Sequence, residues 1–395
     1  MDSRRARKGV RNAAGLTWAV INSVLDKMVN HFSALENDCF VSKRVMTVGD
    51  LRREFTESFG RKQSVRPNKS ETQVFWERWA EFVEEMSVAN SWTKATCQKF
   101  AALKKHILDW DSRVTFEALT ERALQGFVAY LRDDLQMRNS TIGNQVGFLK
   151  WFLRWATAKG YNRNLAFQAF SPKLKTAANQ VVFLEWQELM KVYDYVVPAN
   201  GARVELTDME GNRYVKTVHD SAAIAKARDI FCFCCFTSLR YSDAANLKRA
   251  NIKGDVMTIT TVKTADTITI ELNKYAKSIL ERYADRDFGG RALPPMTNQR
   301  MNIYLKDLCE LCGFNQPITR TFYRGSERID ETLPKFELIG THTGRRTFIC
   351  NALSLGIPAE VVMKWTGHSD YKSMKPYIDI ANSTKAKAME LFNRL

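Results

Sequence analysis

The sequence predicts an α-rich chain of at least two domains, a small helical bundle followed by a larger mixed α+β domain. Its 395 residues correspond to two or three domains at about 100–200 residues each. Apolar residues recur at three- and four-residue steps over most of residues 71–170, as in amphipathic helices. Beyond residue 181, helical patterns surround two segments, 202–217 and 256–270, whose apolar and polar residues alternate as in antiparallel β-hairpins.

Changes in composition predict the domain limits. Residues 1–68 have a basic tip and one helical stripe, and they end in a polar, Pro-containing linker at 62–70. Residues 69–170 form the helical bundle, with helices from 71, over 92–108 and 120–135, and from 139 until Gly160. Thr120 is expected to cap the third helix. Residues 171–181 are a second linker, and residues 182–395 form the larger domain with a C-terminal tail.

The larger domain is expected to contain several helices around the hairpins. The turn of the second hairpin falls at residues 264–266, with Lys263 near its tip. The expected helices span residues 183–196, 221–238, 273–284, 297–313, 343–355 and 358–365, with a short helical tail at 383–395.

The charge balance points to an anionic partner. Lys and Arg number 59 against 43 Asp and Glu, for a net charge of +16. A folded basic protein of this size most often meets a polyanion, and nucleic acid is the first candidate; a basic surface kept for solubility is the alternative. No run approaches the roughly 18 apolar residues of a membrane helix. The N-terminus lacks the apolar segment of a secretory signal, so a cytoplasmic protein is expected.

The cysteines predict thiols in a reducing compartment. Cys232, Cys234 and Cys235 lie in an apolar run and are expected to be buried as small hydrophobic residues. Cys309 and Cys312 form a lone CxxC pair, and no second ligand pair at workable spacing is visible for zinc. There is no phosphate-binding Gly-rich loop with Lys and no acidic cluster for Mg²⁺, so no metal and no cofactor are expected.

Four features of the larger domain carry residues suited to chemistry on a phosphodiester. Taken singly, each has an ordinary explanation, such as a helix-end charge, a solvated helix face, a turn or a half-buried aromatic. The features are Arg240 with Asp243 three residues on, Lys263 in the hairpin, His342 with Arg345 three residues on, and Gly367-His368 followed by Tyr377.

Taken in order, these features resemble the tyrosine recombinase (phage integrase) family. Its pattern is Arg, a hairpin Lys, His-x-x-Arg, Gly-His and then Tyr. The resemblance covers the chain from about residue 71 and implies a SAM-like core-site-binding domain followed by the catalytic domain. The segments Thr343-Gly344-Arg345-Arg346-Thr347-Phe348 and Met374-Lys375-Pro376-Tyr377 resemble integrases of Bacteroides-type conjugative and mobilisable elements.

Residue chemistry supports the same assignment. Two guanidiniums, on Arg240 and Arg345, are a natural clamp for the charge that grows on a phosphate under attack. Tyr377 is the expected nucleophile, and with a reference pKa of about 10 it needs nearby cations and a base. His342 is placed to accept that proton.

The resemblance implies the remaining roles. Lys263 would protonate the departing 5′ oxygen, His368 would hydrogen-bond to the phosphate, and Asp243 would orient an active-site cation. Energy would be stored in a 3′-phosphotyrosine, which needs no ATP and no metal.

The resemblance also implies the partners. The two domains would close on double-stranded DNA, and the chain would act as a homotetramer on two core sites through a Holliday junction, with DNA-bending or directionality proteins as accessory factors. The tail would dock in a neighbouring subunit through Leu391, Phe392 and Leu395, or else fold back on its own domain. Expected DNA contacts are Lys94, Lys104, Lys105, Arg138, Ser140, Thr141, Lys150, Lys173 and Lys175.

Several alternatives stay open at this point. Tyr371 lies too close to His368 for the family spacing. Tyr323, in an expected basic loop, is a DNA contact or a packing aromatic. Arg346 points about 100° from Arg345 on a helix and would serve a salt bridge or a backbone phosphate. The rival functions are a type IB topoisomerase-like relaxer and a non-catalytic DNA-binding relative. Residues 1–60 lack the β-rich pattern of a full arm-binding domain, and the 202–217 insertion has no assigned role.

Overall fold

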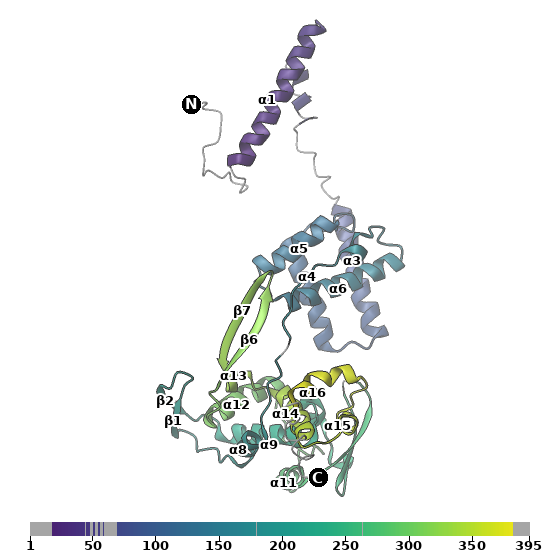
Figure 1. Cartoon of the computed structure of the whole chain (residues 1–395). Helices are drawn as coiled ribbons and strands as arrows, with labels where there is room; N and C mark the ends of the chain where they lie inside the picture. The colour runs from purple at the N-terminus through teal and green to yellow at the C-terminus, as the bar shows by residue number, and fades with distance from the viewer. Residues whose placement is uncertain are drawn as a thin grey trace, which may run out of the picture. The chain divides into compact units, whose positions relative to one another are not determined.

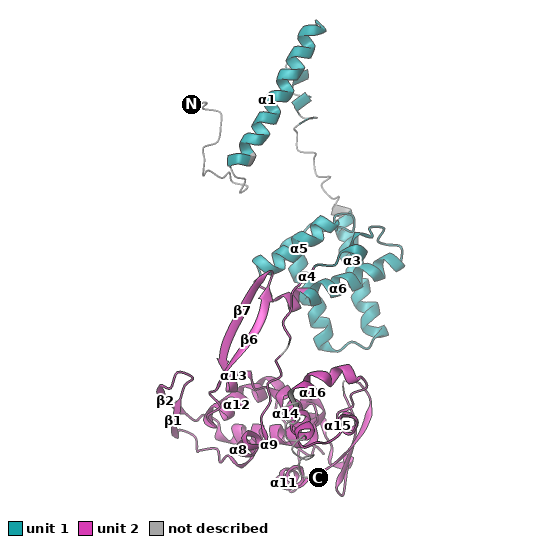
Figure 2. Cartoon of the chain, viewed as in Figure 1, with its two compact units in different colours: residues 1–135, 143–172 teal, residues 136–142, 173–395 magenta. Residues whose placement is uncertain are grey.

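The computed structural model describes residues 18–381, except 44, 48–49, 52–53, 56–57, 59–68, 179 and 263. The chain has two compact units (Figures 1 and 2). Unit 1 comprises residues 1–135 and 143–172, and unit 2 comprises residues 136–142 and 173–395. Among the described residues, no helix has the length and apolar character needed to cross a membrane. The domain limits expected from the sequence stay predictions.

Unit 1 is helical. It contains α1 (Trp18–Val41) and then α3 (Lys69–Ala89), α4 (Lys94–Trp110), α5 (Glu121–Asp133), α6 (Asn139–Ala158) and α7 (Ala166–Ala169), with the start of α6 grouped in unit 2. The hydroxyl of Thr120 accepts a hydrogen bond from the Ala123 amide at 3.2 Å, so Thr120 caps α5 as expected. Gly160, just beyond α6, has a φ of +78°, which suits glycine at a helix end.

Aromatic rings form the core of the bundle in unit 1. Phe75, Trp79 and Phe82 on α3 meet Phe152 on α6 at centroid distances of 5.3, 4.8 and 5.4 Å. Phe100 on α4 lies 5.4 Å from Phe82, and all five side chains are buried. Each ring removes a large apolar area from water, so this cluster holds the three helices together.

Unit 2 is built around α9 (Ser221–Thr237), which is buried from Asp229 to its end. The longer helices that pack on it are α8 (Trp186–Asp194), α11 (Lys274–Glu281), α12 (Asn298–Leu311) and α14 (Thr341–Ser354). The cysteines of α9 are buried, as predicted, and burial raises the pKa of the Cys234 thiol to about 12. The shorter helices are α10 (Tyr241–Asn246), α13 (Lys335–Leu338), α15 (Ala359–Thr366) and α16 (Lys375–Ala381).

The predicted hairpin at 256–270 is present and belongs to a three-stranded antiparallel sheet. Its strands are β3 (Ile252–Lys253), β4 (Val256–Thr260) and β5 (Thr267–Glu271), in the order β3-β4-β5. Met257 pairs with Ile270 and Ile259 with Ile268, and these four side chains are buried. Threonines occupy the opposite, exposed face, which explains the alternation seen in the sequence.

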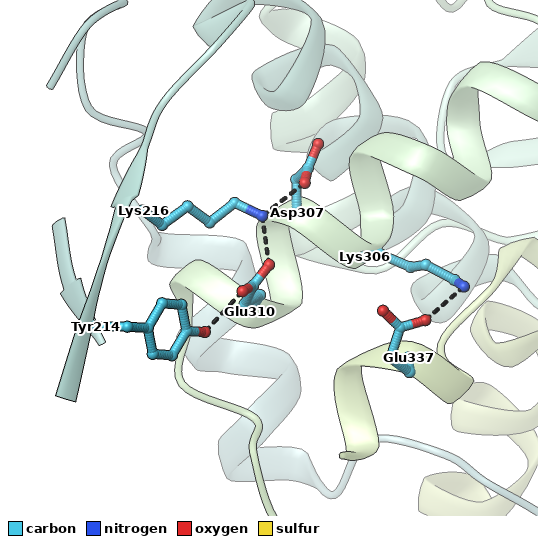
Figure 3. A network of polar contacts seen from close by, with 6 residues as sticks. All are labelled: Tyr214, Lys216, Lys306, Asp307, Glu310 and Glu337. Atoms are coloured by element: carbon cyan, nitrogen blue, oxygen red, sulfur yellow. Dashed lines mark hydrogen bonds and ion pairs between the residues drawn. The ribbon is translucent and has the colours of Figure 1, made fainter. Parts of the chain in front are cut away.

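The expected hairpin at 202–217 is also found, as β1 (Arg203–Thr207) and β2 (Arg213–Thr217). Polar side chains fix it to α12 (Figure 3). The Lys216 ammonium lies 2.7 Å from Asp307 and also pairs with Glu310. The Tyr214 hydroxyl donates to Glu310 at 2.6 Å. A separate pair, Lys306 with Glu337, joins α12 to α13.

The expectation of a basic loop around Tyr323 is wrong. Residues 317–334 form a third hairpin, β6 (Pro317–Arg324) and β7 (Glu327–Pro334). Cross-strand contacts join Thr319 to Thr332 at 2.8 Å and Arg320 to Glu331 at 2.6 Å. On one face, apolar residues alternate with charged ones, as in Ile318, Arg320 and Phe322, and the other face is polar. The segment therefore lacks the apolar alternation by which a half-buried strand is recognised.

Candidate active site

The end of α9 places the first arginine. Ser238 follows α9 in the left-handed conformation, with a φ of +62°, so the chain leaves the helix sharply. The Ser238 hydroxyl donates to the Trp365 carbonyl at 2.9 Å, which ties this corner to α15. Arg240 then stands at the N-terminal cap position of α10. Its Nη1 is buried without a hydrogen-bond partner among the described residues, so this donor is left unsatisfied.

Arg345 lies on α14 and is 2% exposed. Its guanidinium donates to the Ser238 carbonyl at 3.2 Å and to the Thr366 carbonyl. These bonds hold the planar group rigidly between the ends of α9 and α15. Burial, with the neighbouring charge of Arg240, lowers the pKa of Arg345 to about 10. The group therefore stays charged at neutral pH, and its hydrogen-bond partners among the described residues are two carbonyls and an imidazole.

Gly344 allows α14 to approach α9 closely. A Cβ at this position would lie 3.0 Å from the Cβ of Cys234 and 3.5 Å from the Phe231 carbonyl. Contacts at the shorter distance are rarely tolerated in a close-packed interior. Glycine at 344 is therefore what lets Arg345 reach the carbonyl of Ser238 at the end of α9.

His368 follows α15, whose cap Gly367 has a φ of +62°. The Thr366 hydroxyl donates to the Val362 carbonyl at 2.8 Å and lies 2.9 Å from Nδ1 of His368. Because the hydroxyl donates its single hydrogen to this carbonyl, it accepts from Nδ1–H of His368. The neutral imidazole therefore carries its proton on Nδ1. Nε2 then accepts from Arg345, 3.2 Å away. Thr366, which the sequence analysis missed, thus orients the ring; its place just before Gly367-His368 was the available signal.

The environment keeps His368 neutral. Burial, then the positive charges of Arg345 and Arg240, lowers the pKa of His368 to about 4. Both ring nitrogens are engaged by the protein. The hydrogen bond to phosphate expected from the family resemblance therefore requires a rearrangement or a further proton, and in this geometry His368 acts on Arg345.

Asp243 supports the loop that carries the expected general acid. It is 4% exposed, and its Oδ1 accepts from the Val262 amide at 2.8 Å. Lys263, the next residue, lies outside the described residues. The base of its loop is closed by a bond from the Thr261 amide to the Asp266 carbonyl at 2.8 Å. The charge of Asp243 partly offsets the lowering of the Arg345 pKa that burial and Arg240 cause, so Asp243 lies near both the arginine and the hairpin.

His342 and Tyr377 complete the group. His342 is exposed in the first turn of α14, one turn before Arg345, and its charge is felt by His368. Tyr377 on α16 is half-buried against Ile349, Val362 and Met374, and its charged form would raise the pKa of Arg345. Tyr371, the alternative tyrosine, is 55% exposed.

The expected DNA-contact residues of unit 1 occupy different environments. Lys94 and Lys105 are exposed on α4. The Lys104 ammonium lies 5.4 Å from the centre of the Trp76 ring. Lys150 already donates to the Phe170 carbonyl at 2.8 Å, so it contributes to the local fold before any DNA is bound.

Most of the residues of unit 2 that are expected to contact DNA are exposed. Ser140, Thr141, Lys173 and Lys175 are exposed. Arg138 stacks on the Phe322 ring at 3.7 Å and lies 3.5 Å from Glu331. Within the described part of the chain, no group of three or more His, Cys, Asp or Glu is arranged to hold a metal ion.

Two guanidiniums, two imidazoles and a tyrosine thus lie close enough together in unit 2 to influence the pKa values of Arg345 and His368. The sequence matches the phage integrase family at residues 205–384 and the phage integrase SAM-like domain at residues 74–174. The chain belongs to the phage integrase family and is a site-specific tyrosine recombinase. A search of curated proteins finds no match to the sequence.

Solved structures share the fold. A lambda integrase dimer bound to a core site is 14% identical, with a TM-score of 0.56 over 77% of this chain and 95% of that one. A lambda integrase tetramer bound to a Holliday junction is 14% identical, with a TM-score of 0.54 over 82% and 86%. The Tn1549 transposon integrase bound to circular intermediate DNA is 15% identical, with a TM-score of 0.52 over 78% and 98%.

Proposed function

We propose that Tyr377 attacks the scissile phosphate of a DNA core site and that Arg240, Arg345 and His342 assist it. The observation that supports this proposal is that three of the expected residues lie around Arg345. Arg240 and Tyr377 are close enough to influence the pKa of Arg345, and His368 lies 3.2 Å from its guanidinium. The Tyr377 oxygen forms a bond to phosphorus, the bond to the 5′ oxygen breaks, and a 3′-phosphotyrosine results. The phenol proton passes to His342, and Lys263 supplies a proton to the departing 5′ oxygen.

The two arginines supply charge at the phosphate. Arg345 is held by two carbonyls, so its guanidinium does not have to reorganise when negative charge develops on the pentacoordinate phosphorus group. The unpartnered Nη1 of Arg240 offers a second donor. Preorganised donors of this kind are typically worth several kcal/mol at a transition state. His368 contributes by fixing Arg345, and Asp243 contributes by holding the loop of Lys263.

The test is a nicked suicide duplex that carries the core site. The wild-type chain should leave a covalent protein–DNA band, Tyr377→Phe should leave none, and Tyr371→Phe should behave as wild type. An adduct formed by Tyr377→Phe would refute the choice of nucleophile. Relaxation of supercoiled plasmid that lacks the site would favour the topoisomerase-like alternative, and binding without any adduct would favour a non-catalytic relative.

The assembly is proposed to be a homotetramer on two core sites that exchanges C-terminal tails. Unit 2 has an apolar pocket of about 420 Å³, with Trp186, Phe236, Tyr275, Phe348 and Trp365 in its wall. The tail anchors Leu391, Phe392 and Leu395 lie outside the described residues. A neighbour's tail would bury these anchors in that pocket.

Deleting residues 383–395 tests the exchange. The shortened chain should still form the Tyr377 adduct but should fail to assemble beyond single bound chains, as measured by sedimentation on DNA. Unchanged assembly would contradict exchange and favour a tail that folds back on its own domain.

Further expectations are also proposals. The motifs at 343–348 and 374–377 support an integrase of a Bacteroides-type conjugative or mobilisable element. We also propose that accessory DNA-bending or directionality proteins take part and that the protein acts on DNA in the cytoplasm. The proposed domain limits are 1–68, 69–170, 171–181 and 182–395. Footprinting on the ends of the element that encodes the chain would test the target site and the accessory factors together.

A further inference from the structure

Unit 2 contains a second, basic pocket apart from Arg345. It has a volume of about 440 Å³ and lies among β6, the segment 175–182 and Arg346 of α14. Every residue in its wall belongs to unit 2. The wall includes the cationic side chains of Arg138, Lys175, Arg320 and Arg346, together with Thr319 and Tyr323.

The cations of this pocket outnumber the carboxylates that reach them. Arg320 pairs with Glu331 at 2.6 Å, and Arg138 reaches the same carboxylate at 3.5 Å. The Arg346 guanidinium and the Lys175 ammonium have no hydrogen bond or ion pair with any described residue. The other nearby carboxylate, on Asp330, is taken by Arg328 and by the Thr321 hydroxyl.

Two of these arginines have buried donors without acceptors. The Nε atoms of Arg320 and Arg346 are both shielded from solvent and unpartnered among the described residues. A buried donor that lacks an acceptor is costly, and more so on a charged group. The pocket therefore favours an anion that accepts from both guanidiniums.

The helix geometry directs Arg346 away from Arg345. Successive residues of an α-helix point about 100° apart, so Arg346 does not follow Arg345 toward Ser238 and Thr366. Arg346 lies one turn beyond His342, and residues four apart share a helix face. The pocket therefore continues the face of α14 that presents His342.

We propose that this pocket binds a non-scissile backbone phosphate of the DNA, with Arg320 and Arg346 as its two guanidinium ligands and Lys175 at its edge. A backbone phosphate offers two non-bridging oxygens, and a planar guanidinium can donate to such a pair of oxygens. The pocket is larger than one phosphate needs, and this leaves room for the flanking sugars beside Thr319 and Tyr323. The inference rests on the proposed function only in that DNA is the ligand.

The experiment measures binding of the full chain to a fluorescent duplex of arbitrary sequence over a series of salt concentrations. Phosphate contacts do not depend on sequence, and removing one lowers the slope of log affinity against log salt by about one. Arg346→Gln should show that decrease and roughly tenfold weaker binding at low salt. Arg328→Gln, on the same hairpin as Arg320 but paired with Asp330 outside the pocket, is the matched control and should change the slope little.

The double variant decides whether the two arginines share one phosphate. If they do, Arg320→Gln with Arg346→Gln should lower the slope by about one in total rather than two. Additive losses, or losses in Arg346→Gln no larger than in Arg328→Gln, would overturn the proposal. Thermal unfolding of each variant checks that the fold is kept, and Arg346→Lys should restore most of the slope.

This test does not depend on catalysis. If the wild-type chain forms the Tyr377 adduct but the two arginine variants keep the wild-type salt slope, only the pocket assignment fails. If the slopes change as expected but Tyr377→Phe still forms the adduct, the pocket assignment stands and the choice of nucleophile fails.

Discussion

Nε2 of His368 lies 3.2 Å from the guanidinium of Arg345, and burial together with the charge of this arginine keeps the imidazole neutral. The neutral ring accepts from the arginine, and the charge of the arginine disfavours a proton on the ring. The site is therefore set for a neutral histidine beside two permanent cations, and this arrangement has consequences for pH dependence.

Mild acid should destabilise unit 2 through His368. The folded pKa of His368 is lowered to about 4, below the ordinary value of about 6.5, so the unfolded chain binds the proton more readily between these values. This contribution to the free energy of unfolding is complete above pH about 6.5 and is lost as the pH falls toward about 4. Chemical denaturation across this range should show the loss.

The variant His368→Asn should flatten that pH profile, whereas His219→Asn, at an exposed position, should leave it unchanged. If His368→Asn keeps the full acid sensitivity, the proton is taken up elsewhere.

Gly344→Ala should weaken both stability and cleavage. The added methyl group would meet Cys234 at 3.0 Å, and overpacking of this kind typically costs about 1–3 kcal/mol. If α14 moved away to relieve this clash, Arg345 would move with it. Urea unfolding and adduct yield are the measurements.

Gly147→Ala is the matched control, because nothing lies within 4 Å of a Cβ built there in α6. It should be neutral or stabilising by up to about 1 kcal/mol. Equal effects of the two changes would show that α14 and α9 are not closely packed at Gly344.

Asp243→Ala should release the loop of Lys263. The change removes the acceptor of the 2.8 Å bond from the Val262 amide, so this amide should exchange with solvent faster and adduct formation should slow. Asp243→Asn keeps an oxygen acceptor and should retain much of the protection. Hydrogen exchange of Val262 separates the two variants; unchanged protection in Asp243→Ala would refute this role.

Lys216→Met should loosen the β1–β2 hairpin (Figure 3). It leaves Asp307 and Glu310, both partly buried, without their shared cation, and unpaired groups of this kind cost about 1–3 kcal/mol. Lys306→Met removes a more exposed pair, with Glu337, and should cost less than about 1 kcal/mol. Thermal unfolding ranks the two variants, and a larger cost for Lys306→Met would contradict the assignment.

Local patterns in the chain were enough to predict the α9 helix, its buried cysteines and the hairpins at 202–217 and 256–270. They sufficed because apolar periodicity depends on neighbours within one or two turns. The order Arg240, His342, Arg345, His368 and Tyr377 was enough to indicate a family, and the family match confirms it. The β6–β7 hairpin escaped prediction because charged residues such as Arg320 and Glu331 interrupt its apolar face.

Only the folded chain shows how these residues meet. The bond from Arg345 to Ser238 spans 107 residues and the contact with His368 spans 23, so neither distance follows from a local pattern. The left-handed turn at Ser238, the close packing at Gly344 and the hydroxyl of Thr366 together orient Arg345 and fix the tautomer of His368. Residue types select the chemistry from a short stretch of sequence, whereas hydrogen-bond geometry and burial depend on long-range packing, which exists only in the tertiary structure.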